Sequence, residues 1–116
     1  MTRLPEERQR LERAKARLDR LSFYPEPVRI DRVRILVAPA FFRLPGYGNF
    51  HGFTLARTIL VRKPDVSDNL ITHELCHVWQ MQHAPVRATI GWFRYPYRQN
   101  PFEIEARRAV DETRSA

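Results

Sequence analysis

The pentapeptide His73-Glu74-Leu75-Cys76-His77 decides how the rest of this chain is interpreted. On an α-helix, two residues four positions apart lie about 6 Å apart along the axis and about 40° apart around it. Both imidazoles therefore share one face, where they can bind a single metal ion. Glu74 directly follows His73, and from there it can hold a metal-bound water and accept its proton. The spacing H-E-x-x-H is the signature of zinc hydrolases.

The sequence around this motif predicts a buried helix. Ser67 is a suitable N-cap, and acidic residues next to it favour the first turn. Apolar side chains then leave almost no polar face: Leu70, Ile71, Leu75, Val78, Trp79 and Met81. A helix that is apolar on nearly all sides is buried in a core. In the alternative interpretation, both histidines only form hydrogen bonds to backbone carbonyl groups within that core.

Composition indicates one small soluble domain that spans residues 1–116. The chain has 116 residues, of which 43% are hydrophobic and 28% charged, and this balance is ordinary for a globular protein. Its longest apolar run, Ile35 to Phe42, contains Pro39 and is too short for a membrane span. The first residues lack the apolar core of a signal peptide, and the single Cys76 fits a reducing compartment. We therefore expect a cytoplasmic protein with no membrane partner.

The charge of the chain allows acidic partners without specifying one. The formal net charge is +7, and among 20 basic residues only Lys15 and Lys63 are lysines. A basic protein can bind nucleic acid, but the arginines are spread along the whole chain and form no dense cluster. Nucleic acid is thus a possible partner, although we do not expect binding to it as the main function.

Periodicity predicts a helix and two strands before the motif. Pro5 to Leu21 has a narrow apolar stripe at helical spacing, whereas Val28 to Val37 alternates apolar and polar residues as a half-buried strand does. The aromatic and glycine-rich stretch from Phe41 to Phe53 is expected to be a loop that leads into a short edge strand. Thr54 to Val61 is rich in strand-forming residues and is expected to be a second strand.

The segment after the motif is expected to be an aromatic connector and one last helix. The connector covers Val86 to Gln99, and the helix runs from Phe102 to about Thr113. Asn100 is its expected N-cap and Pro101 its first residue.

A catalytic zinc site needs a third protein ligand, and His83 is one candidate. Its spacing gives H-E-x-x-H-x-x-Q-x-x-H, close to the metzincin pattern, which has a glycine where this chain has Gln80. That glycine lets the helix break, and the left-handed turn it allows is costly for glutamine. No methionine follows Met81 to form the metzincin Met-turn. These two departures disfavour His83.

The last helix supplies the other candidates, Glu103 and Glu105. Both carboxylates flank an apolar stripe, and a His-His-Glu set is a standard catalytic zinc shell. The helical projection gives little reason to prefer one of the two glutamates as the ligand. Glu103 also fits a capping box with Asn100, in which case Glu105 would be the ligand. Cys76 is not expected to be a ligand, because it projects about 100° away from His77 on the helix.

The motif followed by a short connector and a Glu-x-x-Ala helix resembles the gluzincin metallopeptidases, including minimal single-domain forms. The resemblance covers about residues 54–110 and implies that His73, His77 and Glu103 bind Zn²⁺. It also implies an α+β, zincin-like fold: an N-terminal backing helix, a small twisted sheet, the H-E-x-x-H helix and a C-terminal glutamate helix. Many such families place an aspartate soon after the glutamate, to orient a ligand histidine. Here Arg107 and Arg108 follow, so the partner of that histidine is left unassigned.

The expected activity is zinc-dependent hydrolysis of a peptide or protein substrate, with Glu74 as the general base. A sheet edge within residues 46–61 would pair with the extended substrate. Tyr95, Tyr97 and His51 are candidates for stabilising the oxyanion, but they are left out of the catalytic set. Two alternatives stay open: a zinc-binding interaction module that cleaves nothing, and a nucleic-acid-associated metalloprotein.

Overall fold

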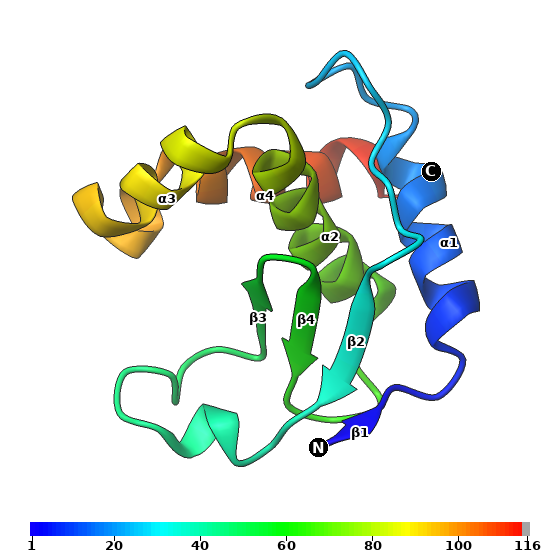
Figure 1. Cartoon of the computed structure of the whole chain (residues 1–116), viewed down its shortest axis with the longest axis vertical. Helices are drawn as coiled ribbons and strands as arrows, with labels where there is room; N and C mark the ends of the chain where they lie inside the picture. Colours follow the sequence, from blue (N-terminus) through cyan, green and yellow to red (C-terminus); the bar gives the residue numbers. More distant parts are fainter. Residues whose placement is uncertain (115–116) are drawn as a thin grey trace.

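A computed structural model describes residues 1–114, which form an α+β fold with four α-helices and a mixed four-stranded sheet (Figure 1). The strands are β1 (Thr2–Arg3), β2 (Arg34–Val37), β3 (Gly52–Leu55) and β4 (Thr58–Val61). The α-helices are α1 (Glu7–Leu18), α2 (Asp68–His83), α3 (Pro85–Arg94) and α4 (Pro101–Thr113). Two short 3₁₀ helices are η1 (Phe41–Arg43) and η2 (Tyr97–Gln99). No helix in this range has both the length and the apolar character needed to cross a membrane.

The strand order is β1-β2-β4-β3, which leaves β3 at one edge of the sheet. β2 and β4 run parallel in the centre, with Ile35 opposite Ile59, while the two outer strands pair antiparallel to their neighbours. Because β4 lies on only one side of β3, the backbone groups on the other side of β3 have no strand partner among residues 1–114.

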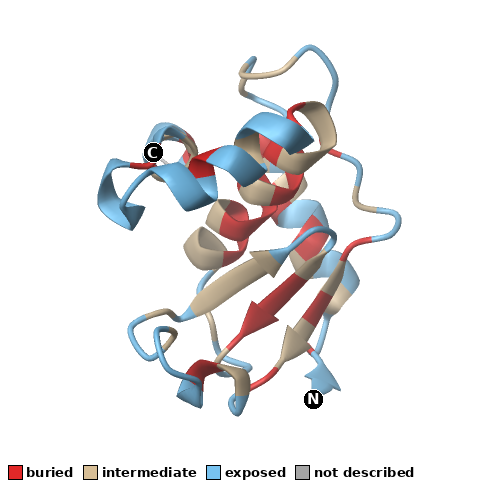
Figure 2. Cartoon of the chain, turned by 60° about the vertical axis from the view of Figure 1, so that its left-hand side comes forward, coloured by how far each residue is buried: buried red, intermediate tan, exposed pale blue. Residues whose placement is uncertain are grey.

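Helix α2 is the centre of the molecule, in contact with α1, α4 and the edge strand β3. Figure 2 shows that buried residues concentrate in α2 and in the central strands. The largest buried side chains of this core are Leu11, Leu18, Ile35, Ile59, Ile71, Leu75 and Trp79. Each such side chain contributes about 1.5–3 kcal/mol when it is fully buried, so the core holds α2 firmly in place.

The two helices that carry the candidate ligands begin where the sequence predicts. Ser67 Oγ accepts a hydrogen bond from the backbone N–H of Leu70 at 3.1 Å, and this caps α2. Asn100 Oδ1 accepts one from the backbone N–H of Phe102 at 2.9 Å, and Pro101 is the first residue of α4. The expected α+β class and the existence of both helices are therefore confirmed.

The prediction for residues 54–61 was wrong in one respect, because this stretch is a hairpin and not one strand. β3 ends at Leu55, the chain turns at Ala56 and Arg57, and β4 begins at Thr58, which lies opposite Leu55. Ala56 adopts a φ of 53°, a left-handed conformation that usually requires glycine or asparagine. The turn therefore carries no sequence signal. The predicted loop and edge strand are confirmed, with β3 as that edge.

Three other elements differ from the prediction, two in their bounds and one because no helix was expected there. The first helix is shorter than 5–21 and runs from Glu7 to Leu18. Only Arg34–Val37 of the expected strand 28–37 is a strand, because its earlier apolar residues, such as Val28 and Val33, are buried as loop residues against the core. The connector 86–99 contains the helix α3, which was not expected.

Candidate metal centre

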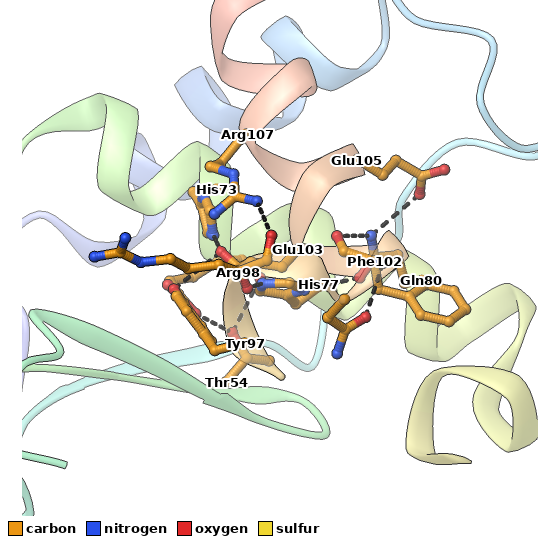
Figure 3. Close-up of polar contacts among 12 residues, drawn as sticks. Thr54, His73, His77, Gln80, Tyr97, Arg98, Phe102, Glu103, Glu105 and Arg107 are labelled. Atoms are coloured by element: carbon orange, nitrogen blue, oxygen red, sulfur yellow. Dashed lines mark hydrogen bonds and ion pairs between the residues drawn. The ribbon is translucent and has the colours of Figure 1, made fainter. Parts of the chain in front are cut away.

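Three side chains from two helices converge on one point. His73 and His77 project from α2 and Glu103 from α4, and one ligand atom of each lies within 4.8 Å of the others. His77 Nε2 lies 3.0 Å from Glu103 Oε2, and His73 Nε2 contacts the other carboxylate oxygen (Figure 3). It is the one such group of histidine, cysteine and acidic residues found within residues 1–114. These three residues can hold a metal ion.

The other candidate ligands lie elsewhere. Glu105 accepts a hydrogen bond from the hydroxyl of Tyr24 at 2.6 Å, and His83 stacks on the same tyrosine ring with a centroid distance of 5.3 Å. Cys76 is fully buried and does not belong to the group. The alternative capping role of Glu103 is not observed either, because its carboxylate faces the two histidines. Of the three candidates, the structure brings Glu103 alone to the histidines.

Gln80 holds the ring of His77, a contact that the sequence did not reveal. Its amide nitrogen donates to the backbone oxygen of Phe102 at 2.8 Å and to Glu105 at 3.1 Å. Its amide oxygen therefore faces His77 Nδ1, at 2.7 Å. From this network we infer that Nδ1 carries a hydrogen and donates it, which leaves Nε2 to bind a metal. Metal-binding histidines in proteins are usually oriented by such an outer hydrogen bond.

Charge interactions within the group favour a bound cation. Burial by itself lowers the pKa of His77, but the hydrogen bond that its ring donates to the Glu103 carboxylate and the negative charge of Glu74 outweigh burial and raise that pKa to about 9. Burial likewise raises the pKa of Glu103, yet its hydrogen bonds with both histidines hold it well below the ordinary value. In the metal-free protein a proton therefore stays on His77 at neutral pH. A metal ion must displace this proton when it binds.

Glu74 is the buried carboxylate beside this group, with 5% of its surface exposed. The hydroxyl of Thr54 on β3 donates a hydrogen bond to Glu74 Oε1 at 2.8 Å. Gly52 on the same strand leaves space for the Glu74 side chain, because a Cβ atom at Gly52 would lie 3.2 Å from Glu74 Cγ. The edge strand therefore fixes the position of Glu74.

Tyr97 is the one of the three oxyanion candidates that contacts the group. Its hydroxyl donates a hydrogen bond to Glu103 Oε1 at 3.0 Å, and burial together with the charge of Glu103 raises the pKa of Tyr97. His51 lies farther out, in the lining of a large cleft, and Tyr95 lines neither this cleft nor the smaller cavity described next.

Two cavities meet at the group. The smaller, of about 220 Å³, is lined by His77 and mainly by apolar residues of β3, α2, α3 and α4, among them Phe53, Met81, Trp92 and Phe102. The larger, of about 1030 Å³, includes His73 and three arginines. Glu74 and Tyr97 line both cavities, so a ligand that reaches the candidate metal site has space on either side.

Comparison with known proteins finds no matching family model, no matching curated protein and no matching solved structure.

Proposed function

We propose that this chain is a zinc-dependent peptidase of the gluzincin type. The observation that carries the proposal is the convergence of His73, His77 and Glu103 beside the buried carboxylate of Glu74. Glu74 forms no ion pair within residues 1–114, and burial of such a carboxylate costs several kcal/mol of desolvation. A purely structural metal site gains nothing from that cost. A hydrolase needs a base of this kind next to its reacting water.

The donor set fits zinc. Two imidazole nitrogens and one carboxylate are a common catalytic zinc shell that leaves a position open, and the Gln80 contact already directs His77 Nε2 toward Glu103. His73, His77 and Glu103 would hold the ion. When bound, zinc lowers the pKa of a water molecule and polarises the scissile carbonyl group.

The chain's own residues account for the remaining steps. Glu74, oriented by Thr54, accepts a proton from the attacking water and passes it to the leaving amine. The Tyr97 hydroxyl, which contacts Glu103, is the side chain that would stabilise the developing oxyanion by turning its hydrogen bond toward it. The unpaired edge of β3 next to Glu74 suits an extended peptide, which would bind by adding a strand.

Substitution of Glu74 tests the proposal. Glu74→Gln keeps the shape and the hydrogen bond from Thr54, so it should retain one zinc per chain and the fold. It should lower cleavage of a broad fluorogenic peptide library at least about 100-fold, the loss expected when a general base is removed. Zinc content by elemental analysis and thermal melts check the first expectation, and initial rates check the second. Glu112→Gln, an exposed change on α4, is the matched control.

Two results would contradict the proposal in different ways. If Glu74→Gln cleaves as fast as the wild type, the proposed mechanism is wrong. If the fully zinc-loaded wild type cleaves no peptide in the library, the chain is a zinc-binding module without turnover.

A further inference from the structure

The large cleft brings positive charge to one side of the candidate metal site. Its lining includes His73 and the arginines Arg98, Arg107 and Arg114, together with the acidic residues Glu74 and Asp111. The smaller cavity on the His77 side has no arginine or lysine in its lining. The two sides of the site therefore differ in charge, although both are open to a ligand.

Two of these arginines have no acidic partner in the described part of the chain. Arg114 forms an ion pair with Asp111 at 3.5 Å, but no ion pair within residues 1–114 involves Arg98 or Arg107. The one side-chain hydrogen bond of Arg107 goes to the backbone oxygen of Arg98, at 2.9 Å. This bond joins the Arg107 side chain to the backbone of Arg98, so the guanidinium group of Arg98 takes no part in it (Figure 3).

Both arginines are held next to residues of the site. Arg107 follows Glu103 by four positions on α4, so the two side chains share a face of that helix. Arg98 directly follows Tyr97, whose hydroxyl contacts Glu103. α4 and η2 therefore fix the backbone positions of both arginines beside the site.

We infer that the cleft on the His73 side is a substrate subsite in which Arg98 and Arg107 bind a carboxylate of the peptide. Guanidinium groups form paired, charge-assisted hydrogen bonds with carboxylates, so two of them in the lining of one cleft favour an anionic ligand. The carboxylate is either an Asp or Glu side chain or the peptide's C-terminal group. This inference deepens the proposed function, since it takes the ligand to be a peptide.

Peptide binding to a protein that does not cleave tests the subsite independently of catalysis. Fluorescein-labelled peptides that differ only in Glu against Gln, or in a C-terminal acid against amide, are titrated into zinc-loaded Glu74→Gln protein. Fluorescence anisotropy gives the Kd of each. We expect one acidic form to bind about tenfold more tightly than its neutral counterpart, as is typical of hydrogen bonds to charged groups. Whichever pair shows the preference identifies the source of the carboxylate.

Substitution of Arg98 and Arg107 tests whether these two arginines cause the preference for the acidic peptide. In the Arg98→Gln/Arg107→Gln variant the ratio of the two Kd values should fall to about one. The matched control Arg43→Gln, at an exposed arginine outside the cleft, should leave the ratio unchanged. Melting curves and zinc content show that each variant is folded and loaded.

Several outcomes would overturn the inference. They are equal binding of acidic and neutral peptides, a preference that persists in the double variant, or an equal loss in Arg43→Gln. Displacement of the acidic peptide by a single-stranded DNA oligonucleotide that binds more tightly through the same arginines would assign the cleft to nucleic acid instead. A protein that prefers acidic peptides but cleaves none keeps the subsite and loses the proposed peptidase function. A protein that cleaves peptides without this preference keeps the proposed peptidase function and loses the subsite.

Discussion

The two histidines of the candidate metal centre have different surroundings. His77 is held through both ring nitrogens, by Gln80 on one side and Glu103 on the other, and it borders the apolar cavity. His73 contacts Glu103 through Nε2, and no side chain within residues 1–114 holds its Nδ1; it borders the large basic cleft. On the His77 side of the site, these contacts fix the orientation of the ligand ring. On the other side, His73 borders the cleft for which we propose a carboxylate ligand.

The largest expected effect concerns the residue that both sides share. Glu103→Ala removes the carboxylate that contacts both histidines, so zinc affinity should fall more than 100-fold, beyond the roughly 10–100-fold typical of outer partners. Competition with a chromophoric chelator measures this affinity. Glu105→Ala, two residues along the same helix, is the control and should change the affinity far less. Equal zinc affinity in Glu103→Ala and wild type would remove Glu103 from the site.

Gln80→Leu affects the His77 side alone. Without the amide oxygen, His77 Nδ1 loses its acceptor and the ring loses its fixed orientation, so zinc affinity should fall about 10–100-fold. The same chelator competition checks this, with Gln82→Leu as control, because Gln82 bonds to Arg29 on the other side of α2. If Gln80→Leu binds zinc as the wild type does, the proposed difference between the two histidines is wrong.

The proton on His77 makes both zinc affinity and the stability of the metal-free fold depend on pH. The pKa of about 9 in the folded, metal-free protein lies above the ordinary value of 6.5, so the ring is protonated at pH 7 and must lose its proton when zinc binds. Zinc affinity should therefore fall about tenfold for each pH unit below 9. The same raised pKa stabilises the metal-free fold below about pH 6.5, and this contribution is lost as the pH rises through 9.

Calorimetry in buffers of different ionisation enthalpy measures the released proton directly. Zinc binding at pH 7.5 should release about one proton, and Gln80→Leu, which removes one of the contacts that raise the pKa of His77, should release less. Binding without proton release would show that the metal-free site does not hold this proton.

The smallest expected effect is that of Gly52→Ala. The new methyl group would lie 3.2 Å from Glu74 Cγ and 3.3 Å from Leu70 Cδ1, so β3 or the Glu74 side chain must shift by a few tenths of an ångström. Cleavage should fall severalfold while zinc affinity stays at the wild-type value. Gly48→Ala is the control, since a Cβ atom at Gly48 would meet nothing within 4 Å. A loss of zinc in Gly52→Ala would mean that β3 supports the ligands as well as Glu74.

Local sequence signals made α2 and α4 predictable. Where such signals are absent, at the β3–β4 turn and in α3, the prediction was wrong. Ser67 and Asn100 mark the helix starts because a cap acts within one turn. The hairpin turn at Ala56 has no such marker. Helix α3 was not predicted, because the aromatic residues of this segment indicate a connector. α3 leaves apolar side chains at the surface, with 82% of Phe93 exposed, so burial periodicity does not define it.

The candidate site was predictable as far as local spacing defines it. The positions of His73, Glu74 and His77 follow from one helix. Residues two apart on α4 point in nearly opposite directions, so the choice between Glu103 and Glu105 depends on how α4 is rotated against α2. Only the resemblance to gluzincins favoured Glu103 beforehand. The Gln80 contact depends on the same docking, since its amide also reaches the backbone of Phe102 on α4.

The short length of β3 has a consequence for the proposed binding and cleavage of peptides. The strand has four residues, and a chain that adds to a sheet edge forms hydrogen bonds with only every second residue of it. At about 0.5–1.5 kcal/mol for each bond, such an edge holds a peptide too weakly to retain it. The two fragments of a cleaved peptide would therefore dissociate quickly. The same brevity limits unwanted pairing between copies of the chain, since long open edges are the ones that promote aggregation.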